Sequence, residues 1–162
     1  MKLKNFILIV LAIFLEYLRD YLFINVNLYI EFLENLNIGL NVFNYTDSFL
    51  FSIIKSFEIK SLTQIKWVMS LFFALVFHFL GVLFSHWNFS KLKHKEFLKI
   101  HRIGGAVLLS FSLLIYIFGK FMKLETQINF YFVSLELSHF IQSLLYPISF
   151  LILFSSFNIK KT

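Results

Sequence analysis

The stretch Glu16-Tyr17-Leu18-Arg19-Asp20 places three charged side chains directly after ten apolar residues, Phe6 to Leu15. Successive residues of a helix are about 100° apart, so Arg19 and Asp20 fall within roughly 60° of Glu16 on either side. The three charges therefore share one stripe, and the opposite face stays apolar. In a membrane, such a stripe must face protein rather than lipid.

The composition of the rest of the chain indicates a membrane protein. Of 162 residues, 59% are hydrophobic and only 15% are charged, which is outside the usual balance of soluble domains. Four stretches reach the roughly 20 mostly apolar residues that cross a bilayer. We therefore expect an all-α, polytopic membrane protein, a four-transmembrane-helix bundle that forms a single membrane domain over residues 1–162. The absence of cysteine excludes disulfides, thiolate metal sites and a cysteine nucleophile.

The formal net charge is +6, yet the lysines gather at the ends of apolar runs, as residues that anchor helices near anionic headgroups do. This pattern indicates the lipid bilayer, not nucleic acid, as the partner of the basic groups.

The first span is expected at about 5–24 and to continue as a helix to residue 37, because no Gly or Pro precedes Gly39, which would cap it. A break at residues 25–27 is the alternative. No small-x-small cleavage site follows the apolar run, so the segment is expected to stay as an uncleaved signal anchor. The external loop 38–64 would carry an interfacial helix at about 48–57, which is too short to span.

The second span is expected at 65–87 and the third at 103–119. Small and polar residues of the second span recur at intervals of four and three within an arc of roughly 80°, which predicts a packing face; they are Ser70, Ala74, His78, Gly81 and Ser85. Gly105, Ser112 and Gly119 give the third span a ridge of its own. Between the two spans, a basic loop, 88–102, is expected to bind lipid headgroups through Lys91, Lys93, Lys95, Lys99 and Arg102.

The external connection 120–129 and the fourth span, 130–157, complete the chain, and a kink is expected at Pro147. Nine of the fifteen Lys and Arg residues fall on the N-terminus, the basic loop and the C-terminus. By the positive-inside rule, these parts are cytoplasmic in a multi-pass protein of the plasma (inner) membrane.

A polar pocket is expected in the outer half of the bundle. Counted at 1.5 Å per residue, Arg19 and Asp20 reach roughly the depth of Ser143 and His139. The predicted walls are Glu16, Arg19, Asp20, Glu136, His139 and Ser143. The pocket is either a buried ion-pair network that fixes the helix register or a site for an ion, proton, headgroup or substrate.

No metal or cofactor is expected. Glu136-x-x-His139 resembles half of a carboxylate-bridged di-iron site, but the motif occurs once where that family needs it twice. A haem needs two histidines at one depth on facing helices; His86 and His101 could match at the inner surface, while His78 is expected to have no histidine at its level. No internal repeat of the kind that transporters show is apparent, and no discontinuous helix with a glycine break at mid-membrane, which argues against a transporter.

These observations favour an accessory or structural subunit of a larger membrane assembly, bound to another membrane protein or to further copies of itself. One alternative is a membrane enzyme or an ion- or proton-coupled carrier that uses the outer-half pocket. A second is a haem or quinone electron-transfer subunit.

Overall fold

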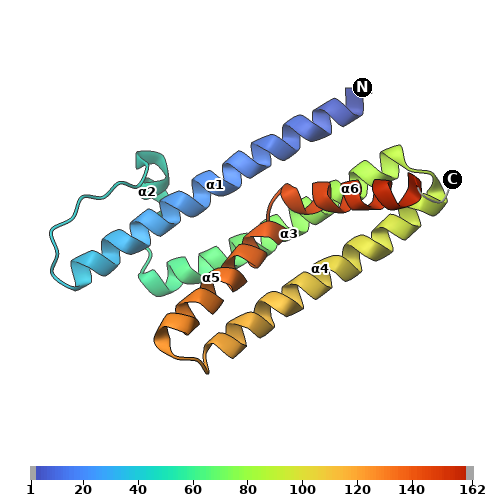
Figure 1. The fold of residues 1–162 in the computed structure, drawn as a ribbon. Coiled ribbons are helices and arrows are strands. Elements are labelled where there is room, and N and C mark those ends of the chain that lie inside the picture. Colours follow the sequence, from blue (N-terminus) through green and yellow to red (C-terminus); the bar gives the residue numbers. More distant parts are fainter. Residues whose placement is uncertain (1–2, 160–162) are drawn as a thin grey trace. The chain divides into compact units, whose positions relative to one another are not determined.

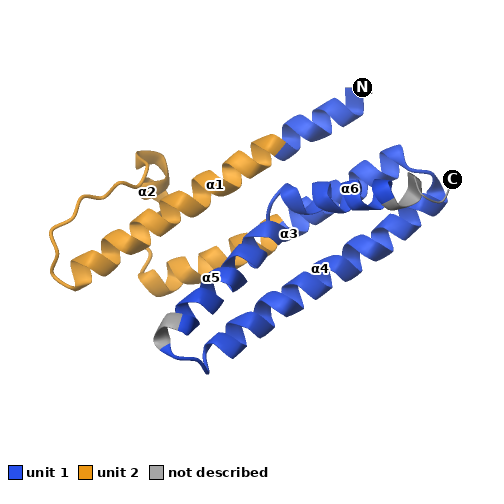
Figure 2. Cartoon of the chain, in the orientation of Figure 1, with its two compact units in different colours: residues 1–12, 74–162 blue, residues 13–73 orange. Residues whose placement is uncertain are grey.

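The computed structural model describes residues 3–159, apart from the side chains at 124, 125 and 157–159. All regular structure in this part of the chain is helical (Figure 1). The helices are α1 (Leu3–Asn37), α2 (Ser48–Ile54), α3 (Ile59–Asn88), α4 (Lys91–Gly119), α5 (Leu124–Ile141) and α6 (Leu145–Ile159). The chain divides into two compact units, one of residues 1–12 and 74–162 and one of residues 13–73 (Figure 2).

Two helices, α3 and α4, are long and apolar enough to cross a membrane. A third candidate span results if α5 and α6 are counted as one broken span, with a bend of 73° at the break. The protein is therefore an all-helical chain with two or three candidate membrane-spanning helices.

The helix α1 runs unbroken through residues 25–27 and ends where the sequence places its cap. Gly39 adopts a φ of 80°, and Leu40 N–H donates to the Asn35 carbonyl at 3.0 Å. Glycine reaches this left-handed conformation without steric cost, which is why it so often follows the last turn of a helix.

Within the unit of residues 13–73, α2 packs on α1. Leu50 and Ile54 of α2 join Val26, Tyr29 and Leu62 in a buried apolar cluster. Tyr29 O–H also donates to the Lys55 carbonyl at 3.0 Å, just after α2 ends. The short helix expected at 48–57 is therefore present over residues 48–54, and part of its apolar surface is covered by protein.

The segment 88–102, expected to be a basic loop, is helical from Lys91 onward. Only Phe89 and Ser90 separate α3 from α4, because Ser90 is followed by residues with good helix propensity and without Gly or Pro until Gly104. The two helices therefore form a hairpin, and residues equidistant from the turn come to the same level. Ser85 Oγ lies 2.9 Å from His94 Nδ1 across it.

The helix α4 packs mainly on α5, beside it in Figure 1. The ridge residues Gly105, Ser112 and Gly119 are buried. Ser112 Oγ donates to the Ser134 carbonyl at 2.8 Å, and Ser134 Oγ donates to the Ser112 carbonyl at 2.9 Å. A Cβ on Gly119 would lie 2.8 Å from Phe130 Cβ, so the two backbones approach closely there. The connection before α5 covers only residues 120–123, not 120–129 as expected.

The segment expected to form a fourth span is broken, and the break precedes Pro147. The helix α5 ends at Ile141 and α6 begins at Leu145, so Pro147 lies in the first turn of α6. Proline has no N–H and its ring clashes with the carbonyl four residues earlier, which belongs to Ser143. A proline in a first helical turn avoids both penalties. The kink expected at Pro147 is therefore replaced by a break between two helices that lies just before the proline.

Candidate functional site

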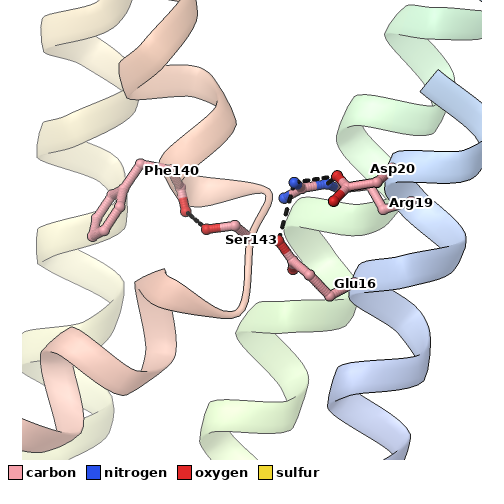
Figure 3. Close-up of polar contacts among 5 residues, drawn as sticks. All are labelled: Glu16, Arg19, Asp20, Phe140 and Ser143. Atoms are coloured by element: carbon pink, nitrogen blue, oxygen red, sulfur yellow. Dashed lines mark hydrogen bonds and ion pairs between the residues drawn. The ribbon is translucent and has the colours of Figure 1, made fainter. Parts of the chain in front are cut away.

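The charged stripe of α1 is held together by ion pairs within the helix (Figure 3). Arg19 Nη2 lies 3.0 Å from Glu16 Oε1, the i, i+3 pair that the sequence suggests, and 2.6 Å from Asp20 Oδ1. The Arg19 side chain is only 15% exposed, whereas that of Asp20 is 52% exposed. One guanidinium thus serves two carboxylates, and the stripe carries a net charge of −1 when all three groups are ionised.

The break between α5 and α6 buries polar groups. Gln142 and Ser143 are each only 4% exposed. Gln142 Nε2 donates to Ser138 Oγ at 2.7 Å, and Ser143 Oγ donates to the Phe140 carbonyl at 2.8 Å (Figure 3). The second bond goes to a carbonyl in the last turn of α5, which also accepts from Ser143 N–H at 3.2 Å.

The other two residues of the predicted pocket, Glu136 and His139, are exposed residues of α5. They belong with Ser143 to the unit of residues 1–12 and 74–162, and Glu16, Arg19 and Asp20 belong to the unit of residues 13–73. A pocket that joins the two groups stays a prediction.

The predicted packing face of α3 becomes more buried toward the turn between α3 and α4. Ser70, Ala74 and His78 are partly buried, whereas Gly81 and Ser85 are buried. A Cβ on Gly81 would lie 2.9 Å from Pro147 Cβ and 3.3 Å from the His101 ring. Gly81 therefore lets α6 and α4 approach α3 at this level.

The most buried ionisable side chain in the described part of the chain is His101 of α4, at 0% exposure. Its ring lies over the His78 ring, with centroids 4.4 Å apart and 25° between the planes. The expectation that His78 has no histidine at its level was therefore wrong. The cause is the short turn: because α4 begins at Lys91, His78 and His101 are ten residues before Asn88 and ten after Lys91.

Aromatic side chains enclose His101. The ring centroids of Phe97, Tyr146 and Phe150 lie 5.1, 4.5 and 5.4 Å from that of His101. Tyr146 O–H donates to the His101 backbone carbonyl at 2.6 Å, so this hydroxyl does not donate to the imidazole ring. We call His78, His101 and these three aromatic residues the imidazole cage.

Neither ring nitrogen of His101 has a hydrogen-bond partner in the described structure. A neutral imidazole carries one donor and one acceptor, and leaving a buried polar group unpaired costs about 1–3 kcal/mol. The sequence contains one signal for this arrangement. Two histidines lie at equal distances from a two-residue turn. Because the loop was predicted at 88–102, which is too long, the pairing of the two histidines was not predicted.

The five basic residues expected to bind headgroups are all exposed, and they lie on the first three to four turns of α4. Around the same hairpin turn, Lys4 Nζ lies 5.5 Å from the Trp87 ring centroid, and the Asn5 and Asn88 side chains exchange hydrogen bonds of 2.7 and 3.2 Å. Lysine and tryptophan side chains commonly gather where helices leave the hydrocarbon.

The arrangement was compared with known proteins. No family model, no curated protein and no solved structure matches the chain. Groups of three or more His, Cys, Asp or Glu side chains able to hold a metal ion are absent from the part of the chain that the structure describes.

Proposed function

We propose that this chain is a small multi-pass membrane protein that works as an accessory subunit of a larger membrane assembly and binds a partner helix through α4. The observation that carries the proposal is a shallow apolar groove of about 390 Å³ along one face of α4. Its lining consists of Ile103, Ala106, Val107, Ser110, Phe111 and Leu114.

The groove lies away from the surface that α4 uses within the chain. The buried ridge Gly105, Ser112 and Gly119 faces α5 and α6, and only 11% of the most apolar part of α4 is buried by the rest of the chain. Ala106 and Ser110 are one turn apart in the groove, and small residues at that spacing let a second helix backbone approach closely in lipid. A helix face that contacts only lipid acyl chains gains nothing from small residues at this spacing.

The proposed topology places α1 as a further span, in an inner membrane, with both termini in the cytoplasm. It is supported by the exposed basic residues at the start of α4 and by the positive-inside rule. The lysines at 2, 160 and 161 that complete this argument lie outside the described residues.

Photo-crosslinking in native membranes tests the proposed partner surface. A benzophenone amino acid at Ser110 is expected to give a discrete adduct with a membrane protein. The same group at Leu109, which lies roughly 130° around α4 from the groove centre, is expected to give lipid adducts only. Lipid adducts from both positions would contradict the proposal, and an adduct of twice the chain mass would identify a second copy as the partner.

One observation supports a second candidate function, that of an ion- or proton-coupled carrier. Carriers often bind substrate where a membrane-spanning helix is interrupted, and the interruption between α5 and α6 buries Gln142 and Ser143. Intramembrane charges such as those of α1 are also frequent in carriers. Reconstitution into liposomes tests this reading, and liposomes that develop no proton or ion flux under an imposed gradient would contradict it.

A further inference from the structure

The helix α2 is apolar on every side, yet the described part of the chain covers only one of its faces. Apart from two serines, α2 consists of Phe, Leu and Ile. Leu50 and Ile54 are buried among residues of α1 and α3, whereas Phe49 and Ile53 are 69% and 52% exposed. Phe49 and Ile53 are one turn apart, so they share a face, which we call the open face of α2. A helix that is apolar all round is normally buried, so the open face needs an apolar environment from outside the chain.

Hydrogen bonds fix the position of α2 along α1. At the start of α2, Tyr21 O–H donates to Asp47 Oδ1 and Asp47 N–H donates to Asn25 Oδ1, both at 2.7 Å. At its end, Tyr29 O–H donates to the Lys55 carbonyl at 3.0 Å. The helix α2 therefore lies beside the part of α1 between residues 21 and 29.

The two tryptophans of the chain indicate where a bilayer lies along α3. Trp67 and Trp87 are 20 residues apart, which is about 30 Å of helix and equals the thickness of the hydrocarbon core. Tryptophan is enriched at both borders of that core. The Phe23 ring of α1 lies 6.4 Å from the Phe73 ring of the antiparallel α3, so Trp67, six residues before Phe73, is level with about residue 29 of α1. The position of α2 is thus at the membrane border and not out in water.

We propose that the open face of α2 inserts into the lipid bilayer, with Phe49 and Ile53 among the acyl chains of the leaflet that the start of α3 enters. Interfacial helices bury their apolar faces about 5–10 Å into the boundary between headgroups and acyl chains. No charged residue lies within α2, and Asp47 and Lys55 flank its two ends. The ligand is therefore the uncharged acyl region of a phospholipid and not an anionic headgroup. Tyr45, just before α2, is also exposed, as suits a side chain at this border.

This inference goes beyond the partner surface proposed for α4 and shares with it only the membrane location. It gives the interfacial helix that the sequence predicts a specific lipid-contacting face.

Spin labelling in vesicles of phosphatidylcholine, which has no net charge, tests the proposal. Because the chain has no cysteine, Phe49→Cys and Ile53→Cys each carry a single nitroxide. Its collisions with oxygen, which concentrates among acyl chains, are compared with its collisions with a water-soluble nickel chelate. The ratio of oxygen to nickel collisions is expected to be several-fold higher at both positions than at the matched control Glu34→Cys, an exposed position near the end of α1. Leu71→Cys, exposed on α3 about 6 Å inside the level of Trp67, gives the value for acyl chains.

Three results of the spin-label experiment would overturn the proposal. More nickel than oxygen collisions at either position of α2 would place the open face in water. A slowly moving label with few collisions of either kind would mean that protein, a second copy or another subunit, covers the face. Both of these results leave the proposed function standing. Few oxygen collisions at Leu71→Cys would show that α3 does not lie in the bilayer, and the membrane location in the proposed function would then fail as well.

Photolabelling of the natural sequence gives a second measurement that needs no substitution. The chain is reconstituted with a phospholipid that carries a diazirine in its acyl chain, and the adducts are mapped by mass spectrometry. Adducts within residues 48–54 are expected in addition to those on α3. Adducts on α3 without any on α2 would contradict the proposal.

Discussion

The charged stripe of α1 and the imidazole cage around α4 both place ionisable side chains in apolar helices, but they satisfy them differently. In the stripe, Arg19 pairs with both Glu16 and Asp20 within five residues of one helix. His101 has neighbouring rings on three helices and no hydrogen-bond partner for its own ring nitrogens. Charged residues in an apolar segment therefore do not by themselves identify the polar groups that the chain leaves without a hydrogen-bond partner.

Among the variants that test this contrast, Gly81→Leu is expected to lose the most unfolding free energy. Gly81 is buried, and its added side chain would press on Pro147 and on the His101 ring. Overpacking of this kind costs about 1–3 kcal/mol, and we expect a loss of unfolding free energy in that range, measured by denaturation in detergent.

The matched control is Ala106→Leu, also a small residue of a candidate span but exposed in the groove of α4. Its unfolding free energy is expected to change by less than about 0.5 kcal/mol. Equal losses in the two variants would mean that the cage is not packed as tightly as the structure indicates.

An intermediate effect is expected in the stripe. Arg19→Gln leaves two carboxylates without their shared cation. Because Asp20 is half exposed and solvent screens it, we expect a loss of about 1–2 kcal/mol, below that of a fully buried pair. Adding Glu16→Gln to Arg19→Gln is expected to recover about 0.5–1 kcal/mol of this, since the two residues are directly coupled.

A double-mutant cycle in the same detergent measures the coupling. Strictly additive losses would show that the Glu16 to Arg19 pair contributes nothing to stability. The contrast between the stripe and the cage would then fail.

The smallest effect is expected at Asp47, the N-cap of α2, which lies outside the spans. The Tyr21 hydroxyl donates to Asp47 Oδ1 at 2.7 Å, and Phe49 N–H donates to the same oxygen at 2.9 Å. The hydrogen bond from Tyr21, and after it the bond from Phe49, holds the pKa of the Asp47 carboxyl below its ordinary value of 3.8. The resulting stability is present above pH 3.8 and is lost as the pH falls through the lower pKa of the folded state.

Tyr21→Phe is therefore expected to raise the pKa of Asp47 toward 3.8. The pH range over which the lowered pKa of Asp47 contributes stability would become narrower. A carbon-detected NMR titration of the carboxyl group measures the shift. Tyr45→Phe, an exposed tyrosine two residues away, should leave the pKa where it is. An unchanged pKa in Tyr21→Phe would show that the hydrogen bond from Tyr21 does not act on the carboxylate.

The sequence predicted well where the deciding residues are close along the chain. The unbroken α1, its end at Gly39 and the pair of Glu16 with Arg19 all follow from local rules of helix geometry. Prediction failed where one boundary controlled distant contacts. Placing a loop at 88–102 moved His101 out of the helix and hid its pairing with His78, and Pro147 was expected to bend a helix that instead ends before it.

The sequence by itself determined that the chain is helical and strongly apolar, with helices long enough to cross a membrane, because composition and run length depend only on local residues. Only the tertiary structure decided which polar groups find partners. Pairing across a hairpin depends on where the turn lies, and a shift of one or two residues moves a side chain by 100–200° around its helix. The imidazole cage exists because a two-residue turn brings His78 and His101 to one level and Gly81 leaves room for α6 beside them.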